Sequence, residues 1–236
     1  MSQTPLIYEQ QGTVGVVRMN DGKVNALSYD MIDAFLAAMD RAEKDASALV
    51  IAGQPGRFCA GFDLKEMTRS PQAAVDLLTH GCELYMRLYG FKLPVVIACT
   101  GHAVAGGALL ALCGDVRIGA AGDFKMGLNE VAIKMPLPVL AIELARARLK
   151  THALTAATLC AQLYAPEAAV DAGYLDQVVQ PDALMATAVG LAGQMGQLDR
   201  HAFMETKKRL RGATITHIMN TLEADMAGFA PPQVSA

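Results

Sequence analysis

The stretch "GHAVAGGALLALCGDVRIGA" (residues 101–120) combines a glycine pair, a long apolar run and a short strand-like ending. Before it, "LPVVIACTG" (93–101) is rich in β-branched residues, which is typical of a buried strand. The chain then turns into a predicted helix that begins at Gly106 and Gly107, and "DVRIGA" (115–120) predicts another strand. A succession of strand, loop, helix and strand with continuously apolar strands predicts an α/β fold.

The flanking sequence continues this pattern. Gln11 and Gly12 predict a hairpin, residues 26–45 a helix capped by Ser28, and residues 48–53 an apolar strand before the loop at 54–63. Beyond Pro136 the chain is mainly helical, with Pro166 near one helix start and Gly173 at its end. We therefore expect an α/β core over residues 1–190 and a helical C-terminal subdomain over 191–236.

Composition excludes several classes of function. The 236 residues carry a net charge of −3 and no basic block, which argues against nucleic-acid binding. The five cysteines and five histidines are dispersed, so we expect free thiols and no metal site. No apolar run reaches the ~20 residues that span a bilayer, and "MSQTPLIYEQ" (1–10) does not resemble a targeting segment. We expect a cytoplasmic protein that makes no membrane contact.

Two short segments place small residues between a predicted strand and a predicted helix. These are "FCAGFD" (58–63) and "AVAGGA" (103–108). Small residues let a ligand approach the backbone, and helix N-termini present unpaired N–H groups. Two such loops can aim two N–H donors at one carbonyl oxygen, which describes an oxyanion hole. Spacing alone favours a simpler interpretation, the tight packing of helix against strand.

The same two segments carry a family resemblance. "FCAGFDLKEM" (58–67) and residues 101–120 resemble the two signature segments of the crotonase, or enoyl-CoA hydratase/isomerase, superfamily. The resemblance implies a crotonase-like spiral of ββα repeats with a helical C-terminal trimerisation subdomain. It also implies an acyl-CoA thioester substrate, a homotrimer or hexamer, and no cofactor apart from the coenzyme A of the substrate.

The resemblance also assigns residues. It places the oxyanion-hole donors on the backbone N–H groups of Phe62 and Gly106. It places the remaining substrate contacts on Lys23, Ala26, Ala60, Asp63, Leu64 and Leu109. Taken without the resemblance, some of these residues have simpler roles: Asp63 suits a helix N-cap, and Lys23 a solvated surface position.

"KMGLNEVAIKMPLP" (125–138) contains the residue that decides the chemistry, Glu130. Hydratases of the family resemble one another in using two glutamates, because hydration positions a water and delivers a proton. Here Leu109 occupies the position of the first glutamate, and Glu130 matches the second. One carboxylate suffices to move a double bond, and the segment resembles that of Δ3,Δ2-enoyl-CoA isomerases. An apolar pocket would raise the pKa of Glu130 toward the working range.

The sequence therefore predicts an enoyl-CoA isomerase in which Glu130 shuttles one proton. Thioester hydrolysis, decarboxylation and weak hydration on the same scaffold remain alternatives, as does an acyl-CoA-binding subunit without activity. Several other residues have simpler interpretations. Asp115 suits a structural role, Cys59 suits packing, and His102 suits packing or hydrogen bonding. Lys207 or Lys208 suits either coenzyme A phosphates or solvent.

Overall fold

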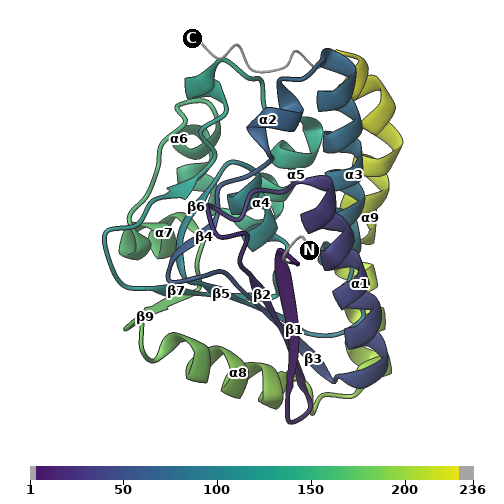
Figure 1. Ribbon diagram of the computed structural model, residues 1–236, viewed down its shortest axis with the longest axis vertical. Coiled ribbons are helices and arrows are strands. Elements are labelled where there is room, and N and C mark those ends of the chain that lie inside the picture. Colours follow the sequence, from purple (N-terminus) through teal and green to yellow (C-terminus); the bar gives the residue numbers. More distant parts are fainter. Residues whose placement is uncertain (1–3, 229–236) are drawn as a thin grey trace.

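The computed structural model describes residues 4–228, which form two sheets enclosed by helices (Figure 1). The larger sheet has the order β1-β2-β3-β5-β7-β9, and the smaller has the order β4-β6-β8. The strands of the larger sheet are β1 (Leu6–Gln11), β2 (Val14–Met19), β3 (Ala48–Ala52), β5 (Val95–Cys99), β7 (Val116–Ala120) and β9 (Gln177–Val179). Those of the smaller are β4 (Gly56–Cys59), β6 (Gly101–Val104) and β8 (Met126–Gly127).

Nine α-helices are present in residues 4–228. They are α1 (Tyr29–Asp45), α2 (Leu64–Met67), α3 (Pro71–Tyr89), α4 (Gly106–Leu112), α5 (Val139–Arg148), α6 (Leu154–Thr158), α7 (Pro166–Ala172), α8 (Leu184–Met195) and α9 (Arg200–Ala227). Short 3₁₀ turns cover Val131–Ile133 and Thr151–Ala153. None of the helices in this part of the chain is long and apolar enough to cross a membrane.

The chain builds a spiral of ββα turns. Successive turns add one strand to the large sheet and one to the small sheet before a helix follows: β3 and β4, then β5 and β6, then β7 and β8. Apart from the β1–β2 hairpin, the paired strands of both sheets run parallel. The predicted α/β spiral is therefore confirmed. The prediction missed β4 and β6, which lie in the segments taken from sequence as a loop and as the start of a helix.

The large sheet separates two apolar cores, because alternate residues of each strand face opposite sides. Leu49, Ile51 and Ile97 face the larger core, which α1, α3, α4, α5 and α9 help to cover. Val50 and Val96 face the smaller core, which α8 covers with Leu184, Ala188 and Ala192. Figure 1 shows α8 alone on its side of the sheet. The predicted boundary at residue 190 lies within α8, so this helix runs continuously across it, and the two-part division stays a prediction.

The predicted local signals are present at the ends of several elements. Gly12 has a φ of 61° in the β1–β2 turn, which glycine adopts without strain. The Ser28 hydroxyl accepts a hydrogen bond from the Met31 N–H and caps α1. Pro166 begins α7, and Gly173, with a φ of 94°, ends it.

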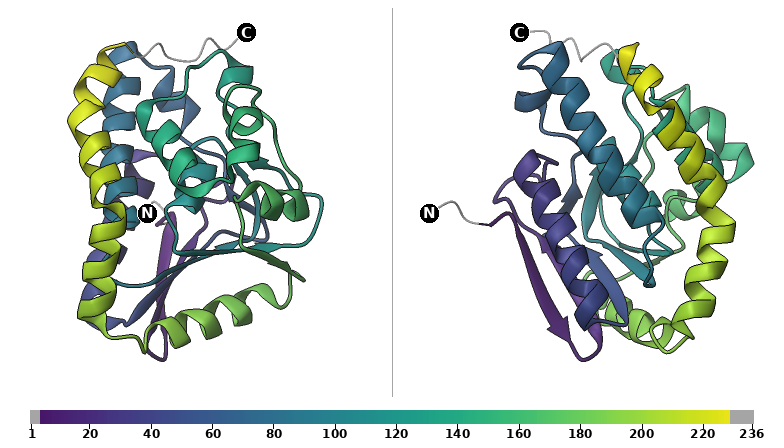
Figure 2. Two further views of the ribbon diagram at one scale, coloured as in Figure 1. Left: turned by 180° about the vertical axis from the view of Figure 1, so that it is seen from behind. Right: turned by 90° about the vertical axis from the view of Figure 1, so that its right-hand side faces the viewer.

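The last helix, α9, is anchored by buried cations rather than solvated along its basic face. It runs beside α3 in both views of Figure 2. Lys207 and Arg211 are 6% and 3% exposed. The Asp115 carboxylate accepts hydrogen bonds from Lys207 Nζ and from the Val95 N–H, both at 2.7 Å, and forms an ion pair with Arg211 at 3.0 Å. The structural role predicted for Asp115 is confirmed.

Lys207 is therefore available neither to coenzyme A phosphates nor to solvent, so both roles considered for this residue were wrong. Its ammonium also donates to the backbone oxygens of Phe91 and Leu93, at 2.9 and 3.1 Å. Burial lowers the pKa of Lys207 to about 8, although Asp115 opposes that shift. The basic sequence pattern of α9 does not show which of its cations meet an acid elsewhere in the chain.

Candidate functional site

An apolar cavity of about 220 Å³ lies where α2, α3, α4, α5 and the segment after β8 meet. Its walls are mainly apolar side chains, including Leu64, Met67, Leu78, Ile133, Met135 and Leu140. Among the described residues that line it, Glu130 carries the single carboxyl group. Low polarity and enclosure strengthen any electrostatic interaction with a ligand inside.

Glu130 is held in the cavity by its own backbone. It precedes the 3₁₀ turn Val131–Ile133, and its carbonyl oxygen accepts from the N–H groups of Ile133 and Met135, at 3.0 and 2.9 Å. The residue is 6% exposed, and its Oε2 atom has no hydrogen-bond partner among the described residues. Burial raises the pKa of Glu130 from 4.5 to about 7. An acid of this pKa can both accept and return a proton near neutral pH.

The two glycine loops meet beside this acid. Gly61 has a φ of 94°, and a Cβ atom added there would lie 3.0 Å from the Gly106 amide nitrogen. Within residues 4–228, neither the Phe62 N–H nor the Gly106 N–H donates a hydrogen bond to a protein acceptor. Both residues line the cavity. The structure thus brings together the two predicted donors and leaves both unpaired, although their role in an oxyanion hole stays a prediction.

Ala105, immediately before Gly106, adopts a backbone conformation that side chains rarely take. Its φ is 50° and its ψ is −128°. Backbone strain of this kind costs on the order of 1–3 kcal/mol and persists only where the surroundings enforce it. Here the Ala105 N–H donates to the Gly127 carbonyl oxygen at 3.0 Å, which ties the start of α4 to strand β8.

Leu109 lies one turn into α4 and faces the same cavity as Glu130. It is 2% exposed, and its side chain offers no group that could hold a water or deliver a proton. Ala60 and Leu64 also line the cavity, as predicted for substrate contacts. Leu109 is thus part of the apolar wall of the cavity, while its contact with substrate stays a prediction.

The other predicted substrate residues do not line the cavity. Lys23 and Ala26 belong to a loop organised by Asp21, whose carboxylate accepts from their N–H groups at 2.7 and 3.1 Å. Asp63 caps α2, because its side chain accepts from the N–H groups of Lys65 and Glu66. The N-cap interpretation of Asp63 is confirmed, and substrate contact by these three residues stays a prediction.

The loop that carries Lys23 is joined to the strand that leads into the site. Asn25, fully buried, donates from Nδ2 to the Arg57 and Phe58 carbonyl oxygens at 3.2 and 3.0 Å. The Ala60 N–H donates to the Val24 carbonyl oxygen at 3.1 Å. These bonds hold the 21–27 loop, which carries Lys23 and Ala26, against β4 and next to the glycine loop at Gly61.

Cys59 and His102 have the packing roles proposed for them. Cys59 is fully buried, and burial raises the pKa of its thiol to about 12, which makes it a poor nucleophile. His102 accepts from the Lys125 N–H through Nδ1 at 3.1 Å and stacks edge-on with Phe124, outside the cavity. Residues 4–228 hold no cluster of three or more metal-ligating side chains.

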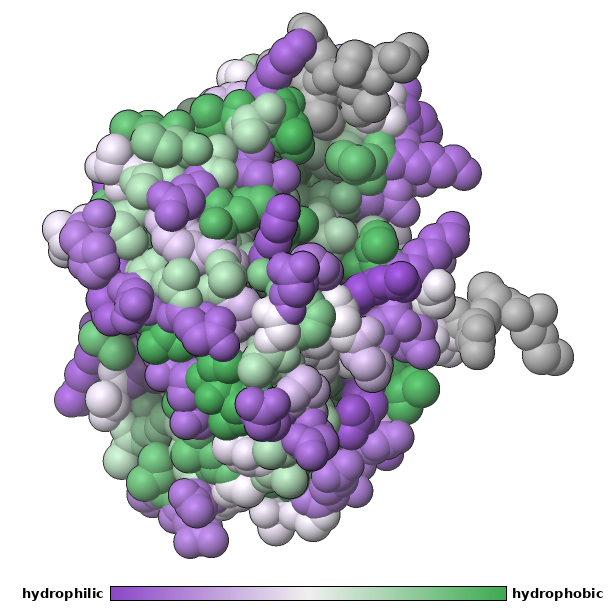
Figure 3. All heavy atoms as spheres, turned by 90° about the vertical axis from the view of Figure 1, so that its left-hand side faces the viewer, coloured by the Kyte–Doolittle hydropathy of each residue, from purple (hydrophilic) through white to green (hydrophobic). Residues whose placement is uncertain are grey.

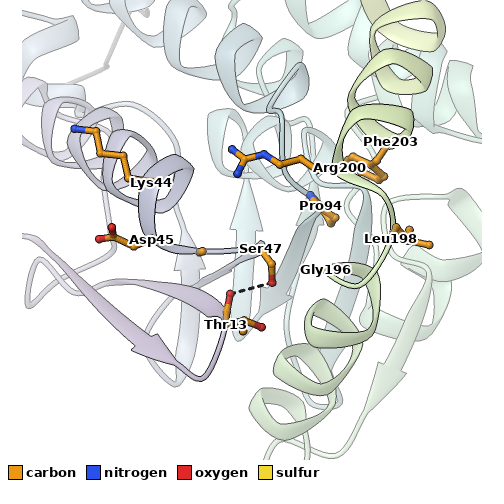
Figure 4. Close-up of a pocket in the computed structure, with 10 residues that line it drawn as sticks. Thr13, Lys44, Asp45, Ser47, Pro94, Gly196, Leu198, Arg200 and Phe203 are labelled. Carbon is orange, nitrogen blue, oxygen red and sulfur yellow. Dashed lines mark hydrogen bonds between the residues drawn. The ribbon is translucent and has the colours of Figure 1, made fainter.

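A second cavity, of about 300 Å³, lies near the β1–β2 turn and the α8–α9 connection (Figure 4). Two of its polar side chains are already engaged within the protein. The Ser47 hydroxyl donates to the Thr13 carbonyl oxygen at 3.1 Å, and Arg200 donates to the Glu43 carbonyl oxygen at 3.0 Å. Elsewhere on the surface, Figure 3 shows hydrophilic residues spread among hydrophobic ones across one whole face. In the described part of the chain, neither the second cavity nor this surface combines an apolar lining with an unpaired acid, as the cavity at Glu130 does.

Several cavity residues were not predicted from sequence. They are Met67, Leu78, Val104, Ala105, Asn129, Ile133, Met135, Pro138 and Leu140. Most are apolar residues whose helical spacing indicates only a buried face, so nothing distinguishes a cavity wall from ordinary core. Asn129 is the exception, since an amide next to the acid in an apolar run is visible in the sequence. Its Oδ1 atom is buried without a hydrogen-bond partner among the described residues.

Comparison with known proteins agrees with this arrangement. The family model described as enoyl-CoA hydratase/isomerase matches residues 9–235. The chain belongs to the enoyl-CoA hydratase/isomerase family. Its fold is that of crotonase-like structures, as its similarity to members of the family with solved structures shows.

Some relatives of this family member are named isomerases and others are named hydratases. The human protein named enoyl-CoA delta isomerase 1, mitochondrial, is 31% identical over 234 residues, covering 97% of this chain and 78% of the relative. A crystal structure of an enoyl-CoA hydratase/isomerase family protein from Pseudomonas syringae matches at a TM-score of 0.93 and 40% identity, covering 96% and 98% of the two chains. A structure named enoyl-CoA hydratase from Mycobacterium marinum matches at 0.90 and 39% identity, covering 96% and 100%. The family acts on acyl-CoA substrates, and the names alone leave isomerase and hydratase side by side.

Proposed function

We propose that this family member is a Δ3,Δ2-enoyl-CoA isomerase in which Glu130 acts as a one-base proton shuttle. The observation that carries the proposal is the pair Glu130 and Leu109. The cavity holds one carboxyl group among the described residues, and a leucine stands where a hydratase would place a second acid. The isomerase name of the human relative supports the same choice.

The reaction needs one base and one oxyanion site. In a 3-enoyl-CoA, ionised Glu130 removes a proton from C2, and the electron pair of that C–H bond forms a dienolate with the negative charge on the thioester oxygen. The N–H groups of Phe62 and Gly106 donate to that oxygen. Protonated Glu130 then returns the proton to C4, which places the double bond between C2 and C3. No atom is gained or lost, and no water takes part.

The protein environment supports each step. The raised pKa of Glu130 keeps its proton affinity close to the working pH, which favours transfer in both directions. Unpaired N–H donors at the oxyanion position typically contribute about 10²–10³-fold to rate each. Leu109 and its apolar neighbours exclude the water that would otherwise add to the double bond. In this proposal coenzyme A is part of the substrate, no further cofactor is used, and the protein assembles as a homotrimer or hexamer.

The experiment is turnover of a 3-enoyl-CoA by wild type and Glu130→Gln, with formation of the conjugated 2-enoyl product followed by ultraviolet absorbance. The variant keeps the shape of the side chain and loses the base, so we expect a rate loss of about 10²–10⁴-fold. Glu143→Gln, on the partly exposed outer part of α5, is the matched control and should retain wild-type rate. A Glu130→Gln enzyme with full rate would overturn the proposal.

Two further readouts separate the alternatives. Release of free coenzyme A would indicate hydrolysis, and appearance of a 3-hydroxyacyl product would indicate hydration. Incubation with a saturated acyl-CoA in D₂O tests for an inactive binding subunit, because a working base and oxyanion site exchange the C2 protons. Tight binding without exchange would identify a protein that binds acyl-CoA and does no chemistry.

A further inference from the structure

One buried tyrosine contacts both residues that carry the unpaired N–H donors. Tyr85, on α3, is fully buried, and its hydroxyl donates to the Gly106 carbonyl oxygen at 2.8 Å. Its ring lies edge-on to the Phe62 ring, with centroids 5.9 Å apart and an interplanar angle of 81°. Edge-on aromatic pairs at this separation are attractive and directional. A single side chain thus fixes Gly106 through a hydrogen bond and Phe62 through packing.

The close fit around Tyr85 leaves little freedom for either residue. A Cβ atom on Gly106 would lie 2.7 Å from the Tyr85 hydroxyl oxygen and 3.2 Å from Phe62 Cδ2. One turn before Tyr85 on α3, a Cβ atom on Gly81 would overlap the edge of the Phe62 ring. The face of α3 formed by Gly81 and Tyr85 therefore holds the Phe62 ring and the first residue of α4 at one fixed spacing.

The Tyr85 hydroxyl acts as a donor throughout the range in which an enzyme works. Burial raises its pKa well above 10, so the group keeps its proton. The carbonyl it contacts belongs to the first residue of α4, and the bond limits rotation of that residue. The Gly106 N–H belongs to the preceding peptide, and its nitrogen would lie 3.0 Å from a Cβ atom added to Gly61. Fixing the Gly106 carbonyl therefore limits the freedom of the adjoining peptide that carries this N–H.

We propose that Tyr85 is a positioning residue that sets the spacing and direction of the Phe62 and Gly106 N–H donors. The proposal rests on the proposed function, since it assigns a support to the oxyanion hole used there. Tyr85 does not line the cavity, so it acts on substrate only through these two residues. N–H donors that already point at the thioester oxygen need no reorganisation when negative charge develops on it, and this lowers the activation free energy.

The test compares wild type, Tyr85→Phe and Tyr89→Phe. Tyr89 is the matched control, one turn further along α3, where its ring packs on the Arg211 guanidinium away from the cavity. The probe is acetoacetyl-CoA, a 3-ketoacyl thioester whose bound enolate absorbs in the near ultraviolet. Octanoyl-CoA, which cannot form such an enolate readily, measures ground-state binding. Turnover of a 3-enoyl-CoA gives kcat and KM.

In Tyr85→Phe we expect the bound enolate fraction and kcat to fall, kcat by about tenfold, a smaller loss than removal of a whole donor. Affinity for octanoyl-CoA and KM should stay within about twofold, and Tyr89→Phe should match wild type in every readout. Gly81→Ala, which pushes on Phe62 without touching the tyrosine hydroxyl, should lower the enolate fraction as well.

Other outcomes overturn the inference, and they distinguish it from the proposed function. If the wild-type enzyme does not favour the bound enolate, the proposed oxyanion hole is wrong, and the inference about Tyr85 is wrong with it. If the wild-type enzyme favours the enolate and Tyr85→Phe gives the same enolate fraction and kcat, the oxyanion hole stands and the positioning role of Tyr85 is wrong. Equal losses of octanoyl-CoA affinity and enolate fraction, or equal effects in Tyr89→Phe, assign Tyr85 a role in folding alone.

Discussion

Leu109 and Glu130 line one apolar cavity, at 2% and 6% exposure, although they come from different elements. Leu109 lies on α4, and Glu130 lies in the segment between β8 and α5. The leucine and its apolar neighbours remove water from the carboxylate, and this desolvation is the main cause of the raised pKa. The leucine at the position of the other glutamate therefore also helps to raise the pKa of Glu130.

The pH dependence of isomerisation should follow the ionisation of Glu130. The base must be ionised in the free enzyme, so kcat/KM should rise with pH, reach half its maximum near pH 7 and level off above it. Initial rates with one 3-enoyl-CoA between about pH 5 and 9 measure this. A midpoint near 4.5, the ordinary value for a glutamate, would show that the cavity does not desolvate the acid.

Glu130→Gln should stabilise the protein in a pH-dependent way. The folded pKa is raised from 4.5 to about 7, so the unfolded chain loses this proton first, and stability falls as pH rises through that window. A neutral amide removes the penalty. We expect a gain of up to about 3 kcal/mol in the free energy of unfolding at about pH 8 and little gain at about pH 4.5. Urea unfolding of both proteins at the two pH values measures the difference, and an equal gain at both would contradict the prediction.

Leu109→Glu should introduce hydration of a 2-enoyl-CoA. The substitution places a second carboxyl group in the cavity with Glu130, which is the arrangement that positions a water and delivers a proton. Leu109→Gln is the control, because it has nearly the same size and polarity without an acid. We expect a measurable 3-hydroxyacyl product from the glutamate variant alone, together with a stability loss of about 1–3 kcal/mol in both variants. Hydration by the glutamine variant, or by neither, would count against the two-acid argument.

Ala105→Gly should raise the stability of the protein and lower its catalytic rate. Relief of strain at φ 50° and ψ −128° is worth about 1–3 kcal/mol, while the added freedom of glycine in the unfolded chain costs about 0.5–1 kcal/mol. The relief of strain outweighs the entropic cost, so the melting temperature should rise. The same freedom loosens the peptide that carries the Gly106 N–H, so kcat should fall. Calorimetry and turnover on the same preparation check both signs, with Ala103→Gly, in β6, as the comparison.

Asp115→Asn should destabilise the docking of α9. The variant leaves Lys207 and Arg211 buried opposite a neutral amide, and removal of one partner from a buried ion pair typically costs about 3–5 kcal/mol. Asp123→Asn, at an exposed position, should cost less than about 0.5 kcal/mol. Denaturant unfolding gives both values, and similar results for the two variants would show that the cluster contributes little.

The sequence predicted the larger features of the fold because they rest on local signals. Periodic apolar residues, the Ser28 cap and the Gly12 turn identified elements that the structure contains. Strands β4 and β6 have four residues each and include glycine or polar residues, so they lack the apolar run that marks a strand. Their pairing becomes apparent only when the parallel partner is in place, and sequence alone does not give that partner.

The candidate site was predictable to the extent that its residues stand in characteristic segments. Glu130, Phe62, Gly106 and Leu109 followed from resemblance, and the structure brings all four to one cavity. Tyr85 was not predictable, because an aromatic residue on the apolar face of a helix looks like ordinary core. The coenzyme A role considered for Lys207 was wrong for the opposite reason, since its charge suggested a ligand and its partner is Asp115. The cytoplasmic location stays a prediction, and the human relative is named as mitochondrial.

The ion pairs that anchor α9 form late during synthesis of the chain. Asp115 emerges from the ribosome with β5 and β7, yet the cations that neutralise it, Lys207 and Arg211, belong to the last helix. At ordinary rates of synthesis they follow after roughly 5–20 s. Until then we expect the Asp115 carboxylate to lack both cations and the side of α3 that contacts α9 to stay uncovered. We expect a chain that stops before Lys207 to keep the Asp115 carboxylate without either cation.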